Sequence, residues 1–309
     1  MKRLLFTLAS AISTYSFAFS QTENDKLFLQ NETKEVTVKE INFNSIKYTF
    51  PGEDVVYSIS KMLISKIEFS NGRSEEFRSP LQEVNSLKDA KKVFVTFNPS
   101  EIDGLDIVGD LFSKAVGVTT LSSVNNVNNR ALLKLKIEAA MMGANALFIG
   151  NQFQRANQYG NENIPGNSTM TTYSAKAYNS NKLDVVAAKE MMENHKFYFH
   201  KKSKLGRNDW SPIFNTPQNV DKKLNPILFD LGEIIEKEGK LFIAPKDFKY
   251  NSKYLQVIRI GEDLITLMDR TDRSIINFDL LSDNHKIVKR QINMVELREQ
   301  QKKEKAKNK

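Results

Sequence analysis

The chain has 309 residues but no cysteine, only three histidines and a single tryptophan. Without thiols it cannot use a cysteine nucleophile, a thiolate metal site or a disulfide, so packing alone must hold the folded chain together. A lipoprotein signal requires a cysteine at its cleavage site, so we expect no lipid anchor of that type. These absences exclude several classes of mechanism before any motif is considered.

The motifs of common catalytic and metal sites are missing as well. The chain contains no G-x-S-x-G, no H-E-x-x-H and no calcium loop of the type D-x-[DN]-x-[DN]-G. His195, His200 and His285 are not clustered as zinc sites require, and the first two fall five residues apart in an expected strand, on opposite faces. We therefore predict no catalytic, cofactor-binding or metal-binding residues, and interpret the histidines as surface or packing residues.

The formal net charge of +8 is concentrated at the two ends of the chain. Lys2 and Arg3 contribute +2, and six basic and two acidic residues between Arg298 and Lys309 contribute +4, which leaves +2 for the body. A body with so little excess charge gives weak support for a nucleic-acid footprint. We expect no specific nucleic-acid partner and a frayed, lysine-rich basic tail over residues 296–309.

Residues 1–20 have the features of a secretory signal peptide. Lys2 and Arg3 precede an apolar run that is interrupted by serines and threonines, and Ala18 and Ser20 suit cleavage before Gln21. The run is too short and too polar for a transmembrane segment. We expect a periplasmic or secreted protein, cleaved near Ser20/Gln21, with no transmembrane segment.

The stretch 129–150 predicts a helix, a tight turn and a buried strand. Asn126, Asn128 and Asn129 are candidate N-caps, because an asparagine side chain can accept from the free amides of a first helical turn. Gly143 falls where a left-handed residue would end the helix, so we expect a positive φ there. Residues 146–149 are apolar and suit a central strand.

The segment EAAMMGANALFI resembles a motif of the YbjQ-like and RcsF-like families, in which a helix passes through A-x-x-x-G-A-N-A-V into a strand. The matching residues are Ala139, Gly143, Ala144, Asn145 and Ala146. Residues 107–110 and 174–178 look like the flanking strands of that family, so the resemblance covers about residues 91–180. It implies a helix packed on a sheet. Independently of the resemblance, the tight join of helix to strand should bury Ala144 and Ala146.

The known mechanisms of these families do not carry over with the fold. The YbjQ-like family is associated with metal binding, and RcsF-like proteins are envelope stress sensors that depend on disulfides and a lipid anchor. This chain lacks cysteine, so it lacks the residues for thiol ligands, disulfides or that anchor. The resemblance implies a scaffold only, since one fold can serve many functions.

Alternating apolar residues before and after this segment predict two β-rich regions. Between Val36 and Phe69 they indicate an antiparallel β domain over residues 34–90 after a loose leader at 21–33, with a hairpin at Asn71-Gly72. The run 59–73 also looks like segments of exported proteins of Bacteroidetes.

After a central α/β domain over residues 91–185, a β-rich domain is expected over residues 186–295. It would include a helix from Leu228 to Lys237 that ends at Gly239. The predicted fold class is therefore α+β, with an N-terminal antiparallel β domain, a central helix on a sheet and a C-terminal β-rich domain.

Two sets of residues could carry chemistry. The first set consists of acidic residues, which we expect on a short helix or in hairpin turns: Glu233, Glu236, Glu238, Asp263, Asp269 and Asp272. The second is the aromatic run Phe197, Tyr198 and Phe199, which could stack on sugars or bases or simply form strand core.

These observations favour an exported, non-enzymatic binding or envelope-associated structural protein whose partner is an envelope protein or glycan. A carboxylate-dependent hydrolase of envelope polymers is one alternative, and it needs two carboxyl groups about 5–10 Å apart in one cleft. A thiol-independent envelope stress sensor is the other.

Overall fold

The computed structural model of the chain describes residues 24–29, 32–118, 122–163, 165–215, 220–221, 225–246 and 248–307. The expected signal peptide, residues 1–20, and its cleavage site lie outside the described residues. The chain forms two compact units, residues 1–78 and 79–309. No helix in the described part of the chain is long and apolar enough to span a membrane. The α+β fold predicted from the sequence is confirmed.

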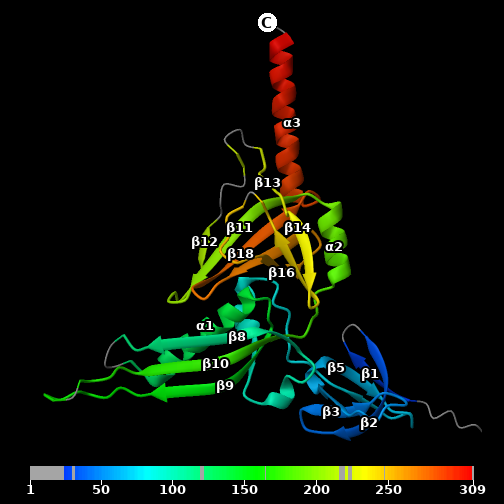
Figure 1. Cartoon of the computed structure of the whole chain (residues 1–309), viewed down its shortest axis with the longest axis vertical. Coiled ribbons are helices and arrows are strands. Elements are labelled where there is room, and N and C mark those ends of the chain that lie inside the picture. The colour runs from blue at the N-terminus through cyan, green and yellow to red at the C-terminus, as the bar shows by residue number, and fades with distance from the viewer. Residues whose placement is uncertain are drawn as a thin grey trace, which may run out of the picture. The chain divides into compact units, whose positions relative to one another are not determined.

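The first unit is a six-stranded antiparallel sheet in the order β4-β3-β2-β1-β5-β6 (Figure 1). Its strands are β1 (Asp25–Leu29), β2 (Thr33–Ile41), β3 (Ser45–Thr49), β4 (Tyr57–Ser60), β5 (Ile64–Glu68) and β6 (Ser74–Glu76). The prediction of an antiparallel β region after residue 34 is confirmed by these pairings.

One detail of this region was predicted wrongly. The expected loose leader contains β1, because the apolar Leu27 is fully buried between β2 and β5. The hairpin predicted at Asn71-Gly72 is confirmed, because Glu68 pairs with Ser74 and the loop between them spans residues 69–73. The amide of Phe69 donates to the carbonyl of Arg73 across that loop at 2.8 Å.

The second unit begins with a four-stranded sheet in the order β7-β9-β10-β8, with α1 against one face (Figure 1). Its elements are β7 (Phe94–Thr96), β8 (Asp106–Val116), α1 (Val124–Met141), β9 (Ala146–Arg155) and β10 (Met170–Asn179). Strand β7 runs parallel to β9, and the other pairs are antiparallel. Two short 3-10 helices, Leu87–Lys92 and Pro99–Glu101, flank β7.

Helix α1 begins earlier than the asparagines suggested. Its N-cap is Ser123, whose hydroxyl accepts from the amide of Asn126 at 3.2 Å, so the expected caps Asn126, Asn128 and Asn129 lie inside the helix. Serine serves this position as well as asparagine does, and the polar segment before the helix hid the boundary.

The end of α1 agrees with the prediction. Gly143 has a φ of +78°, and its amide donates to the carbonyl of Ala140 while the amide of Ala144 donates to that of Ala139. This pair of bonds is the Schellman arrangement that a left-handed residue permits. Ala144 and Ala146 are fully buried, as predicted, so the join of helix to strand leaves no room for larger side chains.

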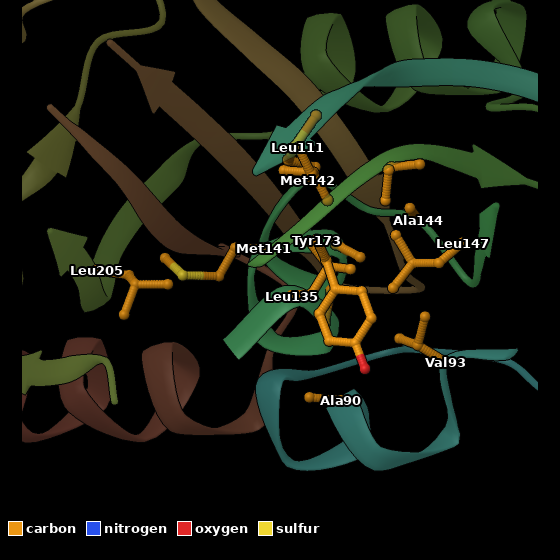
Figure 2. Close-up of a cluster of buried hydrophobic side chains, with 14 of the residues drawn as sticks. Ala90, Val93, Leu111, Leu135, Met141, Met142, Ala144, Leu147, Tyr173 and Leu205 are labelled. Atoms are coloured by element: carbon orange, nitrogen blue, oxygen red, sulfur yellow. The ribbon is translucent and has the colours of Figure 1, made fainter. Parts of the chain in front are cut away.

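One hydrophobic core connects α1, the central sheet and part of the C-terminal sheet. Figure 2 shows Leu135, Met141 and Met142 near Tyr173, with Leu205 of the C-terminal sheet beside them. Met268 and Ile275 of the C-terminal sheet belong to the same cluster. The two sheets of the second unit are therefore held together by shared apolar packing.

The C-terminal sheet has the order β12-β11-β18-β17-β16-β15-β14, with β13 paired to β11. Its strands are β11 (Phe197–Gly206), β12 (Ile213–Asn215), β13 (Leu228–Phe229), β14 (Glu233–Lys237), β15 (Lys240–Ala244), β16 (Leu255–Ile260), β17 (Leu264–Arg270) and β18 (Ser274–Ser282). Helix α2 (Val185–Asn194) precedes this sheet, and α3 (Lys286–Lys307) follows it.

The helix predicted from Leu228 to Lys237 is wrong, because this segment forms β13 and β14. Lys237 pairs with Lys240, and the two residues between them, Glu238 and Gly239, have φ values of 53° and 69°. Those angles are typical of a two-residue type I′ hairpin turn, so Gly239 turns a hairpin instead of ending a helix. The frayed tail expected over residues 296–309 is also wrong, because its described part, residues 296–307, belongs to α3.

Candidate functional site

A groove of about 1260 Å³ lies in the second unit, beside β8. It is bounded by α1, by the end of β11 with the residues that follow it (205–210), and by the hairpin of β17 and β18 at residues 270–275. Side chains from the sheet face opposite α1 line it as well. The groove therefore extends from the helix across the β8 edge to the open face of the sheet.

Alternation along β8 decides which of its side chains face the groove. Leu111, Ser113 and Ala115 are buried, and the Ser113 hydroxyl donates to the carbonyl of Ala131 in α1 at 2.7 Å. Because successive strand residues point to opposite faces, Phe112 and Lys114 point away from α1. Both are exposed, and both line the groove.

The open face continues this surface onto the neighbouring strands. Lys176 of β10 lies opposite Asp110 of β8 and Phe148 of β9, and Ser174 lies opposite Phe112. Cross-strand neighbours such as these lie about 4.5–5.5 Å apart at their Cβ atoms. Cationic and aromatic side chains therefore lie next to one another on this face.

Two guanidinium groups hold the outer edge of β8. Arg270 donates to the carbonyl of Asp110 at 2.6 Å, and Arg130 donates to the carbonyl of Val116 at 3.2 Å. Arg270 fits closely because the facing residue is Gly109, where a Cβ atom would lie 2.7 Å from its Nη1. The ring of Trp210 covers Arg130, with 4.5 Å from the guanidinium carbon to the ring centroid.

Charged groups of the groove are predominantly cationic. The cationic lining side chains are Lys114, Lys134, Lys176, Arg207, Arg270 and Arg273, and the anionic ones are Asp110, Glu138 and Asp272. Six cations against three carboxylates give this site an excess of positive charge, although the body of the chain is close to neutral. Such a local excess attracts an anionic partner.

At the helix side of the groove, Lys134 and Glu138 are largely buried on α1. The ammonium of Lys134 donates to the carbonyl of Arg207 and lies 3.9 Å from the Glu138 carboxylate. Burial raises the pKa of Glu138 to about 7, against the opposing attraction of Lys134 and Arg270. Glu138 therefore changes its protonation near neutral pH, and the positive charge of the groove decreases as pH rises.

Most of the acidic residues considered from sequence lie elsewhere. Glu233 and Glu236 are on β14, and Glu238 is in the β14–β15 turn, because the predicted helix is a hairpin. Asp263 occupies a turn, where it accepts from the hydroxyl of Ser282 at 3.0 Å. Of the six residues, Asp272 alone lines the groove.

Asp269 was expected in a hairpin turn, which is wrong. It is buried in β17 and accepts from the backbone amides of Asn251 and Ser252 at 2.8 Å each. These bonds anchor the loop before β16, so the carboxylate has a structural role. A buried carboxylate needs such donors, since an unpaired one would be costly.

The histidines are separate from the groove. His195 was expected to lie in a strand, but it precedes β11. Its Nδ1 lies 2.9 Å from the carboxylate of Asp283. His200 lies in β11, where burial lowers its pKa, and His285 precedes α3 and accepts from the amide of Ile287. Among the described residues, no group of three or more His, Asp or Glu side chains could hold a metal ion.

The aromatic run of β11 divides between core and a second cavity. Phe197 is buried, whereas Phe199 packs with Phe229, Phe248 and Phe278 at centroid distances of 5.9–6.3 Å. A cavity of about 570 Å³ adjoins these four rings. The packing explains the aromatic pattern of β11 without a ligand, because the rings satisfy one another.

Sequence reasoning missed the cationic residues of the groove. In β8, the alternation of Asp110, Phe112 and Lys114 with buried small or apolar residues was a signal for a polar sheet face. No comparable local signal marked Arg207, in the turn after β11, or Arg270, at the end of β17, because both are far from β8 in the sequence. No protein-family model, curated protein or solved structure matches the chain.

Proposed function

We propose that this chain is an exported, non-enzymatic binding protein, and that the groove beside β8 holds an anionic, carboxylate-bearing envelope protein or glycan. The observation that supports this most is the charge of the groove, six cationic side chains against three carboxylates. Exposed Phe112 and the ring of Trp210 add apolar contact area next to these charges. Sites that combine aromatic and arginine side chains are typical of binding surfaces.

An exported location is part of the same proposal. It rests on the signal-like residues 1–20, and it favours carboxylate-bearing envelope polymers over nucleic acid as partners. Mass determination of the mature chain from the envelope fraction should place its N-terminus at Gln21. A cytoplasmic chain that retains residues 1–20 would contradict this part of the proposal.

The binding proposal is tested by titrating the purified chain with polygalacturonate and poly-glutamate, with neutral dextran as a control. We expect binding to both carboxylated polymers, none to dextran, and weaker binding as salt rises, since the attraction is electrostatic and partly screened. Tighter binding of duplex DNA than of either polymer would show that the class of partner is wrong. No binding to any polyanion would show that the groove is not an anion site.

The variant Lys114→Glu/Lys176→Glu reverses two charges on the open face of the groove. Lys39→Glu/Lys237→Glu makes the same change in net charge at two exposed lysines outside the groove lining. We expect the first pair to weaken binding to carboxylated polymers about tenfold or more and the second to change it little, because the effect of a charge falls off within about 10 Å in salt.

A second candidate, a carboxylate-dependent hydrolase, is favoured by one observation. Glu138, with a pKa raised to about 7, lines the same groove as Asp110 and Asp272. A carboxyl group that is protonated near neutral pH is suited to act as a general acid, with a second carboxylate as base or nucleophile. Turnover of an envelope glycan by the pure chain, abolished in Glu138→Gln, would replace the binding proposal with this one.

A further inference from the structure

Strand β8 is the long outer edge of the central sheet. It pairs with β10 along its whole length, and in the part of the chain that the structure describes no strand pairs with its other side. The register from Gly109 to Val116 is continuous, so no bulge disturbs this edge. An edge of this kind has backbone N–H and C=O groups available for another strand.

The direction of these backbone groups follows from three hydrogen bonds. The amide of Gly117 donates to the carbonyl of Thr169, which lies just before β10, so this amide points toward β10. The carbonyls of Asp110 and Val116 point the other way and accept from Arg270 and Arg130. In a strand, the N–H and C=O of one residue point the same way and alternate between neighbours. Phe112 and Lys114, between the two held carbonyls, therefore direct both backbone groups outward.

The space beside this edge suits an extended chain. The groove of about 1260 Å³ is lined by β8 residues from Asp110 to Val116, and six residue steps at about 3.3 Å each span roughly 20 Å. Arg270 and Arg130 hold the carbonyls at the two ends of this stretch. A segment of about six residues would fill the interval between them.

We propose that the groove binds an extended polypeptide segment that adds to β8 as a strand and directs acidic side chains toward Lys114 and Lys176. This inference rests on the proposed binding function and specifies the partner. Residues opposite Phe112 and Lys114 in an antiparallel pair have side chains on the same face as these two. Acidic residues at alternate positions would therefore lie against the cationic open face, as charge complementarity requires.

The direct test is amide hydrogen exchange of the full chain with and without a synthetic octapeptide of alternating glutamate and valine. We expect the amides of Phe112 and Lys114 to become protected at least about tenfold on binding, because they gain hydrogen bonds. The amides of Leu111 and Ser113 point toward β10 and serve as internal controls. Peptide binding without protection at Phe112 and Lys114 would overturn strand addition.

Two N-methylated versions of the peptide sharpen the test without altering the protein. Methylation of the glutamate amides should weaken binding about tenfold or more, whereas methylation of the valine amides should leave it nearly unchanged, since only the former point toward β8 in an antiparallel pair. Selective loss with the valine set instead would assign a parallel added strand. Equal effects of both sets would overturn strand addition.

Failure of this inference can be separated from failure of the proposed function. If polygalacturonate binds in a manner sensitive to Lys114→Glu/Lys176→Glu but the peptide does not bind, the groove is an anion site for a glycan and strand addition is wrong. If neither probe binds, both the inference and the proposed function are wrong.

Discussion

The two faces of the central sheet are formed by alternate residues of the same strands, but they differ in burial, in side-chain type and in charge. Beneath α1 the residues of β8 and β10 are small or apolar and closely packed, as Ala115 and Ala177 illustrate. On the opposite face, Phe112, Lys114 and Lys176 are exposed beside a cationic groove. The comparison indicates that the covered face determines stability and that the open face and its edge are available for binding.

The largest expected effect is at the join that ends α1. Gly143→Val should lower the free energy of unfolding by about 2–4 kcal/mol, because a side chain must adopt a positive φ and its Cβ would lie 2.9 Å from the backbone oxygen of Ile258. Gly239→Val is the matched control, since Gly239 also has a positive φ but nothing lies within 4 Å of an added Cβ.

Denaturant unfolding of both variants separates the collision from the backbone strain. We expect Gly239→Val to cost only about 1 kcal/mol, the strain alone. If Gly143→Val unfolds at the same denaturant concentration as the parent chain, the join is not the tightly packed feature described above.

The next effect tests the packing at the same join of helix to strand. Ala144 is fully buried, so Ala144→Leu should destabilise the chain by about 1–3 kcal/mol through overpacking. Thermal unfolding measures this change. A melting temperature equal to that of the parent chain would mean that the residues around Ala144 can move apart at no cost.

Glu138 lies on α1 at the helix side of the groove, and its effect on stability depends on pH. Its folded pKa of about 7 is above the unfolded value of 4.5, so its stabilising contribution is complete below pH 4.5 and is lost as pH rises through 7. Between pH 5.5 and 8.5 this group should lower the free energy of unfolding by about 1–3 kcal/mol.

The variant Glu138→Gln should remove this part of the pH dependence, so that it is more stable than the parent chain at pH 8.5. Urea unfolding at pH 5.5 and 8.5 measures it, with Glu190→Gln on the exposed side of α2 as the control. An unchanged pH dependence in Glu138→Gln would mean that the carboxyl group is ionised throughout this range.

The smallest effect is expected at the far end of α3. A chain truncated after Arg298 should keep its free energy of unfolding within about 0.5 kcal/mol, because residues 299–304 are exposed and bury no apolar surface. Val288, near the start of the helix, is buried and remains in place. A loss of more than about 1 kcal/mol on truncation would reveal a stabilising contact of the end of α3.

Local features of the fold could be predicted from sequence, whereas the groove could not. The turn at Gly143 follows from residues within one helical turn of it, so local hydrogen bonding was sufficient. The hairpin at Glu238-Gly239 was mistaken for a helix end because a glycine with positive φ suits both structures. Only the pairing of β14 with β15 distinguishes a hairpin turn from a helix end here.

The groove depends on contacts between distant parts of the sequence. Arg270 is 160 residues from Asp110, to which it is hydrogen-bonded, and Lys134 is 73 residues from Arg207. No spacing or motif in one sequence indicates that such segments meet. The charge of the whole body, close to neutral, also concealed the local excess that the fold creates.

The binding role of the open face is tested most directly by comparing Lys114→Glu/Lys176→Glu with Lys39→Glu/Lys237→Glu in both polygalacturonate binding and thermal unfolding. We predict that the groove pair weakens binding about tenfold or more while its melting temperature stays close to that of the parent chain, because exposed side chains contribute little to stability. The control pair should change neither property. Equal binding by the two double variants would contradict the assignment of this face and its groove as the binding site.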